Sequence, residues 1–273
     1  YWPAQFFWYL AIFSRKSSPS YCIRQNWNLI DFPILLQQDL LNILTFFSKL
    51  RYTKYYLRVL LSNWKDVRES YAQHGEDLLV ENLLGEVNSF IDIGANDGVL
   101  FSNTYKFAKM GARGLCFEPS VITYRKLRLN HLIHPKVKCF RQAVSNQSIM
   151  LPFVERGYES VLSHIDSSSE NDEQKVQATT FTEILNRNRK FNKIDLLSVD
   201  VEGHEKEVFE SLEKAIQARV IILETDKSDP MKLLNLPALH EHKPMYNNGI
   251  NLVLMHNTEK TTTINLPPGF MPC

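Results

Sequence analysis

The 273-residue sequence contains only four cysteines, and no two of them form a C-x-x-C pair: they are Cys22, Cys116, Cys139 and Cys273. This spacing argues against a disulfide framework and against a zinc site built from cysteines, and we expect a reducing, cytoplasmic location. The sequence also lacks an excess of charge of either sign, because 31 Lys and Arg balance 30 Asp and Glu. It therefore gives no overall electrostatic signal for nucleic acid as a partner.

The sequence also lacks an uninterrupted apolar run of the roughly 20 residues that a membrane-spanning helix needs. The opening stretch YWPAQFFWYLAIF is mostly apolar, but it is short and is followed by Ser14, Arg15 and Lys16. Residues 1–66 hold all four Trp and predict an aromatic-rich, basic helical extension. Two interpretations stay open: peripheral contact of residues 1–20 with a membrane, or packing of the extension on the main domain.

From about residue 67 the pattern changes, and short apolar runs alternate with segments of helical spacing. We predict strands over 89–94, 114–119, 137–144, 193–201 and 219–226, and helices over 102–110, 120–132 and 205–212. Residues 249–257 and 260–266 predict two closing strands. The fold class is therefore α/β, with a doubly wound, Rossmann-like sheet over residues 67–273 that is mostly parallel with an antiparallel closing strand. Such sheets bind ligands at the carboxyl ends of their strands.

The first predicted strand runs into the turn SFIDIGANDGVLFSN, residues 89–103. A dinucleotide site would have a second glycine between Gly94 and Gly98 to admit a pyrophosphate, but Asn96 stands there. A ligand without a pyrophosphate matches this turn better. S-adenosylmethionine (SAM) has a cationic sulfonium and a zwitterionic amino-acid end, and the carboxylate of Asp92 can hold the ammonium group of that end. The open alternative is an NAD(P)-dependent oxidoreductase on a Rossmann sheet.

A second acidic residue ends the next predicted strand. Glu118 stands near the end of GLCFEP, where a carboxylate can accept hydrogen bonds from both ribose hydroxyls of a nucleoside. Its distance along the chain from Gly94 suits this role. The alternative for such a residue is that it only caps the helix that follows. The turn and this acid together favour a nucleoside ligand more than either does alone.

An ordered series of motifs resembles the FkbM-type methyltransferases: YAQHGEDLLVENLL, FIDIGANDGVLFSNTYKF, GARGLCFEPS, QAVSN and DLLSVDVEGHEKEVFESL. The series covers roughly residues 70–225. The resemblance implies a class I methyltransferase fold, SAM as the methyl donor, and O-methylation of a hydroxyl on a sugar, a glycan or a related metabolite. A third interpretation stays open, namely a non-catalytic methyltransferase-like partner in glycan assembly.

The resemblance also implies roles for individual residues. The donor's methionine end would lie against Asp92, Gly94, Asn96 and Gly98. Its ribose would be held by Glu118, with Pro119 beside it, and its adenine would lie near Gln142, Ala143 and Val144. Asp200 would face the methyl group or the amino end of the donor, and Gln73, His74 and Glu76 would close over the donor or the acceptor.

Methyl transfer to an alcohol benefits from a base, and the predicted catalytic residues are Asp200, Glu202 and His204, with Glu205 as a further candidate. Three of these have a structural alternative: Glu202 and Glu205 suit the start of a helix, and His204 suits an exposed position there. His74 could likewise cap a helix. Asp200 is harder to explain in this way, because a carboxylate that ends an apolar strand is costly unless it is paired.

Two further features concern a metal and the acceptor. Carboxylates of Asp200, Glu202 and Glu224 could bind a divalent ion, but acidic residues at strand ends are common without one, and we predict no metal. The polar stretch 156–175 reads as a solvated excursion that could carry acceptor specificity, with Ser160 and His164 as candidates. Residues 234–249 would help shape the acceptor pocket.

Overall fold

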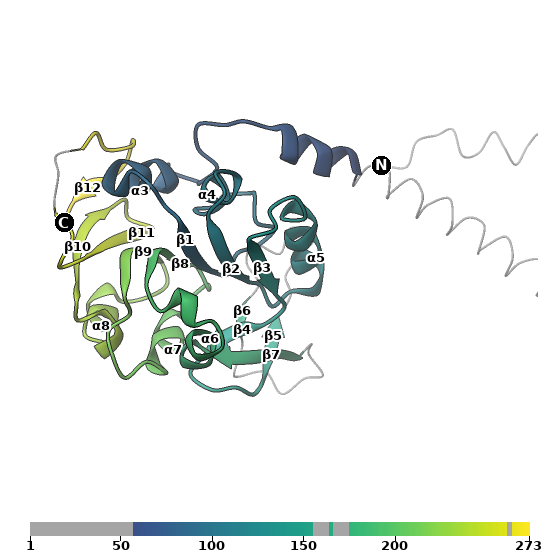
Figure 1. The fold of residues 1–273 in the computed structure, drawn as a ribbon. Coiled ribbons are helices and arrows are strands. Elements are labelled where there is room, and N and C mark those ends of the chain that lie inside the picture. Colours follow the sequence, from purple (N-terminus) through teal and green to yellow (C-terminus); the bar gives the residue numbers. More distant parts are fainter. Residues whose placement is uncertain (1–56, 155–163, 166–174, 261–263) are drawn as a thin grey trace, which may run out of the picture. The chain divides into compact units, whose positions relative to one another are not determined.

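The computed structural model describes residues 57–154, 164–165, 175–260 and 264–273, all of which belong to the unit Tyr56–Cys273 (Figure 1). Residues 1–56 and Ser160 lie outside the described residues, so the membrane contact of residues 1–20 and the acceptor role of Ser160 stay predictions. His164 belongs to a short strand, of which the structure describes the backbone. Among the helices that are described, none combines the length and the apolar character needed to cross a bilayer.

The main sheet confirms the predicted fold class. Its eight strands lie in the order β12 (Met271–Pro272), β10 (His242–Asn247), β11 (Asn251–His256), β9 (Ala218–Glu224), β8 (Ile194–Val199), β1 (Ser89–Ile93), β2 (Arg113–Phe117) and β3 (Val137–Phe140). Strands β3, β2, β1, β8 and β9 are parallel neighbours, and β11 is antiparallel to both β9 and β10. The chain order reverses between β1 and β8, and this switch point is where a doubly wound sheet opens a crevice for a ligand.

Helices cover both faces of the sheet because its central strands are apolar on both sides. The helices are α3 (Glu76–Leu84), α4 (Tyr105–Lys109), α5 (Val121–Asn130), α6 (Phe181–Arg187), α7 (Glu205–Glu210) and α8 (Pro230–Leu234), with 3₁₀ turns η2 (Arg189–Phe191) and η3 (Pro237–Leu239) and a further helix over 57–65. Phe90 and Ile91 are consecutive and both fully buried, but they belong to different hydrophobic clusters. Successive side chains of a strand point to opposite faces, so each cluster is one face of the sheet.

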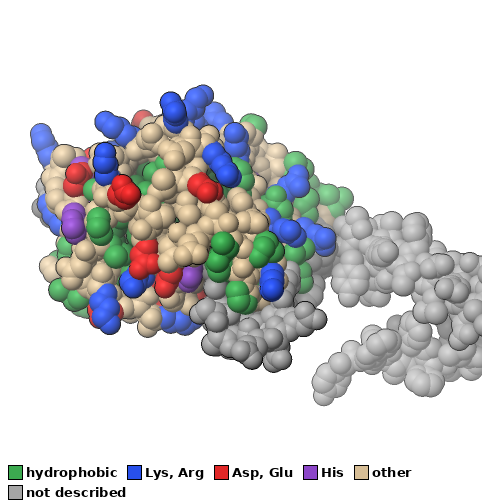
Figure 2. Space-filling model, turned by 90° about the horizontal axis from the view of Figure 1, so that it is seen from below, with side chains coloured by type: hydrophobic (Ala, Val, Ile, Leu, Met, Phe, Trp, Pro, Cys, Tyr) green, Lys and Arg blue, Asp and Glu red, His purple; other side chains and the backbone are tan. Residues whose placement is uncertain are grey.

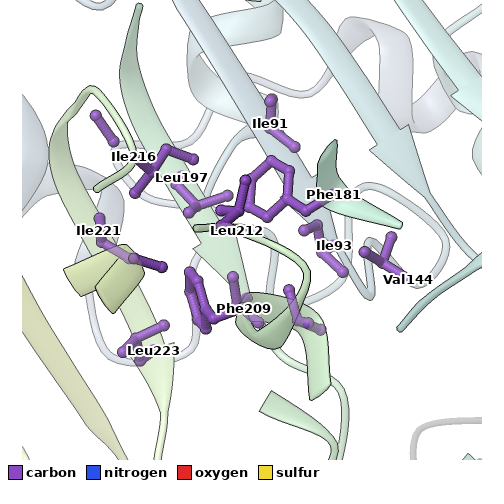
Figure 3. Close-up of a cluster of buried hydrophobic side chains, with 14 of the residues drawn as sticks. Ile91, Ile93, Val144, Phe181, Leu197, Phe209, Leu212, Ile216, Ile221 and Leu223 are labelled. Carbon is purple, nitrogen blue, oxygen red and sulfur yellow. The ribbon is translucent and has the colours of Figure 1, made fainter. Parts of the chain in front are cut away.

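One of these clusters lies beneath α6 and α7. Phe181 and Phe209, from these two helices, pack against Ile91, Leu197 and Ile221 of the strands (Figure 3). The opposite cluster packs side chains of α3, α4 and α5 against the other face. The helix starts follow local sequence signals: Ser120 precedes α5, and its side chain accepts a hydrogen bond from the backbone N–H of Thr123.

The prediction of a single strand over 137–144 is wrong. The chain leaves the main sheet after β3, and β4 (Ala143–Ser145) joins a second sheet with β7 (Lys175–Thr180), β5 (Met150–Val154) and β6 (His164–Ile165), in the order β4-β7-β5-β6. The polar stretch that we read as a solvated excursion therefore contributes β6 and the start of β7. Over residues 175–178 of β7 the side chains alternate between exposed and buried, so only one face of this part of the strand needs to be apolar.

The second predicted closing strand, over 260–266, is also wrong in its described residues, because Lys260 and residues 264–266 belong to no strand. The partner of β11 is instead β10, which precedes it. Pro244 lies inside β10 and cannot donate a backbone hydrogen bond, and the pairing register shifts between Pro244 and Tyr246. This proline made the segment unlike a strand in the sequence.

Candidate functional site

A pocket opens at the carboxyl ends of β1, β2, β8 and β9, beside the switch point. Eleven residues predicted for the donor or the chemistry line it: Gln73, Asp92, Gly94, Asn96, Glu118, Pro119, Gln142, Ala143, Val144, Asp200 and Glu202. Figure 2 views the molecule from below, the side toward which the arrows of β1 and β2 run in Figure 1, and shows separated acidic side chains in a largely tan surface. The sheet thus gathers residues from distant parts of the sequence at one edge.

The end of β1 requires glycine for steric reasons. Gly94 has a φ of 84°, and a Cβ added there would lie 1.7 Å from the carbonyl oxygen of Asp200. The backbone N–H groups of Gly94 and Ala95 both donate to the carbonyl oxygen of Phe117, at 3.0 Å. The turn is therefore clamped between the ends of β2 and β8, where no side chain at Gly94 fits.

Asp92 is a buried carboxylate in the pocket lining. Its side chain is 5% exposed, and its Oδ2 accepts a hydrogen bond of 2.6 Å from the hydroxyl of Thr104. Burial raises the pKa of Asp92 to about 7, and the nearby charge of Asp200 adds to the rise. A cationic ligand group in the pocket would favour the ionised form.

Glu118 directly follows β2 and its side chain accepts hydrogen bonds from two segments that meet there. Its Oε2 accepts a hydrogen bond from the backbone N–H of Asn96, at 3.1 Å, and its Oε1 accepts one from the backbone N–H of Ser120, at 2.8 Å. Asn96 has a left-handed φ of 49°, which asparagine tolerates better than most residues. Glu118 therefore both tethers the start of α5 and presents a carboxylate to the pocket.

A pair of carboxyl groups lies where β8 and β9 end. Asp200 and Glu224 share a side-chain hydrogen bond, and burial, together with Asp200, raises the pKa of Glu224 to about 9. The pKa of Asp200 is raised as well, chiefly because the surrounding protein excludes water from its carboxyl group. The residue nevertheless opens onto the pocket. Two carboxyl groups in hydrogen-bond contact cannot both ionise near neutral pH, so the pair holds one proton there.

Glu202 joins this pair to form an acidic cluster, in which one ligand atom from each residue lies within 4.8 Å of the others. Lys227 forms an ion pair with Glu202, and the proton held by Asp200 and Glu224 removes a further negative charge. The cluster is thus largely neutralised by the chain itself. We assign no metal ion to it.

The family model of the methyltransferase FkbM domain matches residues 92–244, which include the pocket from Asp92 to Glu224. The chain belongs to this family.

Two solved structures resemble this FkbM domain at low sequence identity. Methyltransferase FkbM from Methylobacillus flagellatus KT is 10% identical with a TM-score of 0.42, and the match covers 62% of this chain and 44% of that one. An O-methyltransferase from Bacillus cereus in complex with SAH is 11% identical with a TM-score of 0.37, and the match covers 74% of this chain and 88% of that one. A comparison with curated proteins gives no match.

The chemistry of the pocket lining in this FkbM domain fits SAM. Asp92 is a buried carboxylate that accepts a hydrogen bond from the neutral hydroxyl of Thr104, and a buried carboxylate suits an ammonium group. Glu118 offers carboxylate oxygens at the end of β2, and Phe117, Val144 and Phe153 add apolar surface that suits an adenine ring. These residues would hold the donor's amino end, ribose and base respectively.

Five residues predicted to contact the ligands or to act as a base lie outside this lining, namely His74, Glu76, Gly98, His204 and Glu205. Gly98 has a φ of 79°, and a Cβ there would lie 2.6 Å from Leu127 and 2.9 Å from the ring of His131, so this glycine permits packing of the turn against α5. The ring of His204 lies beside β4, with Nε2 at 2.9 Å from Ser145 Oγ. Burial lowers the pKa of His204, and its contacts with Ser145 and Glu207 hold it away from the pocket.

Structural roles explain the remaining acidic and histidine candidates. Gly75, not His74, is the N-cap of α3, and the side chain of Glu76 accepts a hydrogen bond from the backbone N–H of His74. Glu76 also accepts hydrogen bonds from Asn248 and Asn251, which fastens α3 to the start of β11. Glu205 begins α7 and accepts hydrogen bonds from Gly203 N and the Ser228 hydroxyl, as its structural alternative predicted.

Sequence reasoning missed several residues of the lining. They are Ile93, Ala95, Leu100, Phe101, Ser102, Asn103, Phe117, Phe153, Ser198, Val201 and Asn251, and Glu224 was considered only as a metal ligand. Asn103 lies in the quoted turn, and its side chain donates to Ser198 Oγ at 3.0 Å, which links β8 to the helix side of the pocket. Phe153 comes from the second sheet, so no signal in the sequence pointed to it.

Proposed function

We propose that this FkbM domain transfers a methyl group from SAM to a hydroxyl of a sugar, a glycan or a related metabolite. The observation that carries the proposal is one pocket that contains the buried carboxylate of Asp92 and, at the neighbouring strand ends, the proton-sharing pair Asp200 and Glu224. Family membership supports methyl transfer over the nicotinamide-dependent oxidation that the sequence left open.

SAM supplies a methyl group bonded to a positively charged sulfur. The ionised form of Asp92 would attract the ammonium group, and Glu118 would accept hydrogen bonds from the ribose hydroxyls. Because both carboxylates are fixed by hydrogen bonds from Thr104, Asn96 and Ser120, they would orient a donor without moving.

A hydroxyl acceptor must lose its proton during the transfer. The pair of Asp200 and Glu224 has one ionised oxygen to accept a hydrogen bond from such a hydroxyl and a raised affinity for the proton. Glu202 is less suited to this role because Lys227 forms an ion pair with it. We therefore place the base at the pair, and at Asp200 in particular because it opens onto the pocket.

Calorimetric titration with SAM tests the donor site. Asp92→Asn and Glu118→Gln should each weaken binding by roughly tenfold or more, since each removes a charge-assisted hydrogen bond worth about 1.5–3 kcal/mol. Glu213→Gln is the matched control, because Glu213 is exposed and lies outside the pocket lining. Unchanged affinity in both pocket variants would contradict the assignment of the donor site.

Transfer of a labelled methyl group from SAM to a panel of sugars and glycans tests the reaction. We expect the products to carry label that is stable to alkali. An acceptor whose hydroxyl has been blocked beforehand should take up no label. Donor binding without any labelled product would instead favour the non-catalytic partner in glycan assembly.

A further inference from the structure

The exposed side of α5 and the turn after it carry large aliphatic side chains. Ile122 and Leu129 are each 42% exposed, Ile133 is 45% exposed and Leu132 is 67% exposed. Successive residues of an α-helix are rotated by about 100°, which places Ile122, Arg125 and Leu129 along one narrow face. Leu132 and Ile133 lie in the turn directly after the end of α5. Exposed aliphatic residues that adjoin in this way mark an interaction surface.

The same region carries positive charge without any acidic residue. Between Glu118 and Glu155 the sequence contains no Asp or Glu, while Arg125, Arg128, Lys136, Lys138 and Arg141 are all exposed. We call the exposed residues of 122–141 the α5 face. The net charge of the whole chain is only +1, so this face is a local concentration of positive charge. Figure 1 shows α5 beside β3, at the edge of the main sheet.

The helix over 57–65 packs against the end of α5 and extends the α5 face. The side-chain amide of Asn63 donates to Asn130 Oδ1 at 3.0 Å, and Trp64 Nε1 donates to the carbonyl oxygen of Asn130 at 3.1 Å. This helix contains no acidic residue and exposes Leu57 and Leu61.

The chain that precedes this helix has a matching composition. Residues 1–56 contain six Lys and Arg against two Asp, together with three of the four Trp. Tryptophan and basic side chains are the residue types enriched at the boundary between lipid headgroups and acyl chains. The composition of this preceding segment therefore has the same chemical character as the α5 face.

We propose that the α5 face docks on a membrane surface that contains anionic lipid. Lys and Arg would lie among the negatively charged headgroups, and Ile122, Leu129, Leu132 and Ile133 would enter the headgroup layer. A nucleic acid would use the positive charge but would leave these aliphatic side chains exposed, because bases stack on aromatic side chains. The chemistry of the face favours lipid for this reason.

Co-sedimentation of the full 273-residue chain with vesicles tests the proposal. We expect binding to vesicles of phosphatidylcholine and phosphatidylglycerol, weaker binding as salt is added, and little binding to phosphatidylcholine alone. The double variants Leu132→Glu/Ile133→Glu and Arg125→Glu/Arg128→Glu should each lower the partition coefficient by at least about tenfold. The first removes apolar side chains and adds negative charge, and the second replaces attraction to the anionic headgroups by repulsion.

Matched controls change residues of the same kind elsewhere. Met231 on α8 is 67% exposed, as Leu132 is, so Met231→Glu controls for the loss of an exposed apolar side chain. Lys190→Glu/Lys214→Glu makes the same change in charge away from α5. Both controls should bind vesicles as the unmodified chain does, and circular dichroism of all variants should report the same fold.

Three outcomes would overturn the proposal. The unmodified chain could fail to bind anionic vesicles, or both α5 double variants could bind as well as the controls, which would assign any membrane contact to residues 1–56. Gel filtration could also show that the unmodified chain is a dimer, that Leu132→Glu/Ile133→Glu dissociates this dimer, and that the chain does not bind vesicles. In that case the α5 face would join two copies of the chain. A folded double variant with selectively reduced vesicle binding supports the proposal.

Discussion

The affinity for SAM should fall as the pH is lowered through about 7, because Asp92 must be ionised to attract the ammonium group. Burial raises the pKa of Asp92 to about 7, so roughly half of the unliganded molecules are ionised at that pH and about one in eleven at about pH 6. The fraction competent to bind thus changes about fivefold over this one unit. The dissociation constant of the donor should rise by the same factor.

The titration of Asp92 affects stability with the opposite sign to its effect on SAM affinity, so the two effects can be distinguished. The folded-state pKa of Asp92 lies above its ordinary value of 3.8, so the folded chain binds this proton more tightly than the unfolded chain does. The contribution of Asp92 to stability is therefore fully present below about pH 4 and is lost as the pH rises to about 7. Loss of affinity at about pH 6 would accordingly not come from unfolding caused by Asp92.

Calorimetric titration with SAM at a series of pH values measures the effect, with thermal unfolding recorded in the same buffers. Asp92→Asn keeps an oxygen that can accept the hydrogen bond from Thr104 but cannot ionise, so its weaker affinity should vary little between about pH 6 and 7. Glu213→Gln should retain the pH dependence of the unmodified chain. A pH dependence that persists in Asp92→Asn would refute the reasoning and would point to another titrating group.

Three further changes test other parts of the site. Gly94→Ala should destabilise the fold by about 3 kcal/mol in urea unfolding, because its Cβ would collide with the Asp200 carbonyl; Gly249→Ala, with a similar φ of 85° but no atom nearby, should cost only about 1–2 kcal/mol. Equal costs would contradict the clamp at Gly94. Glu224→Gln should lower the rate of methyl transfer by about 100-fold while leaving SAM affinity within about threefold, and an unchanged rate would remove the pair from the chemistry. Methyl transfer should persist within about twofold in excess EDTA, and abolition that a divalent ion reverses would instead make Asp200, Glu202 and Glu224 a metal site.

The parts of the fold that were predictable are those with strong local signals. Buried parallel strands such as β1 and β9 appear in the sequence as short apolar runs, and the helix after Ser120 begins at a residue that caps it. The second sheet was not predictable because its strands are short or alternate in burial, and β10 was missed because it contains Pro244. Pairing across the sheet supplies the stability that these segments lack locally.

The site residues that could be predicted from the sequence are likewise those with a strong local signal. Residues at the ends of buried strands, including Asp92, Glu118 and Asp200, were found because a parallel sheet brings its carboxyl ends together. Proximity along the chain was a poor guide: His204 closely follows Asp200, yet the short turn into α7 directs its ring toward Ser145. Spacing along the chain determines which strand end a residue follows, but not which way its side chain turns.

The pocket also contains residues whose backbone conformation is strained. Among the described residues, the non-glycine residues with a left-handed φ are Asn96, Phe101 and Glu202, and all three line the pocket. Such a conformation costs a non-glycine residue about 1–2 kcal/mol, so each must be held by contacts from elsewhere in the chain. Asn96 donates to Glu118, Phe101 pairs with Ala72, and Glu202 forms an ion pair with Lys227. Each of these contacts joins segments that are well separated along the chain, so only the assembled fold can impose these conformations and position the pocket's side chains.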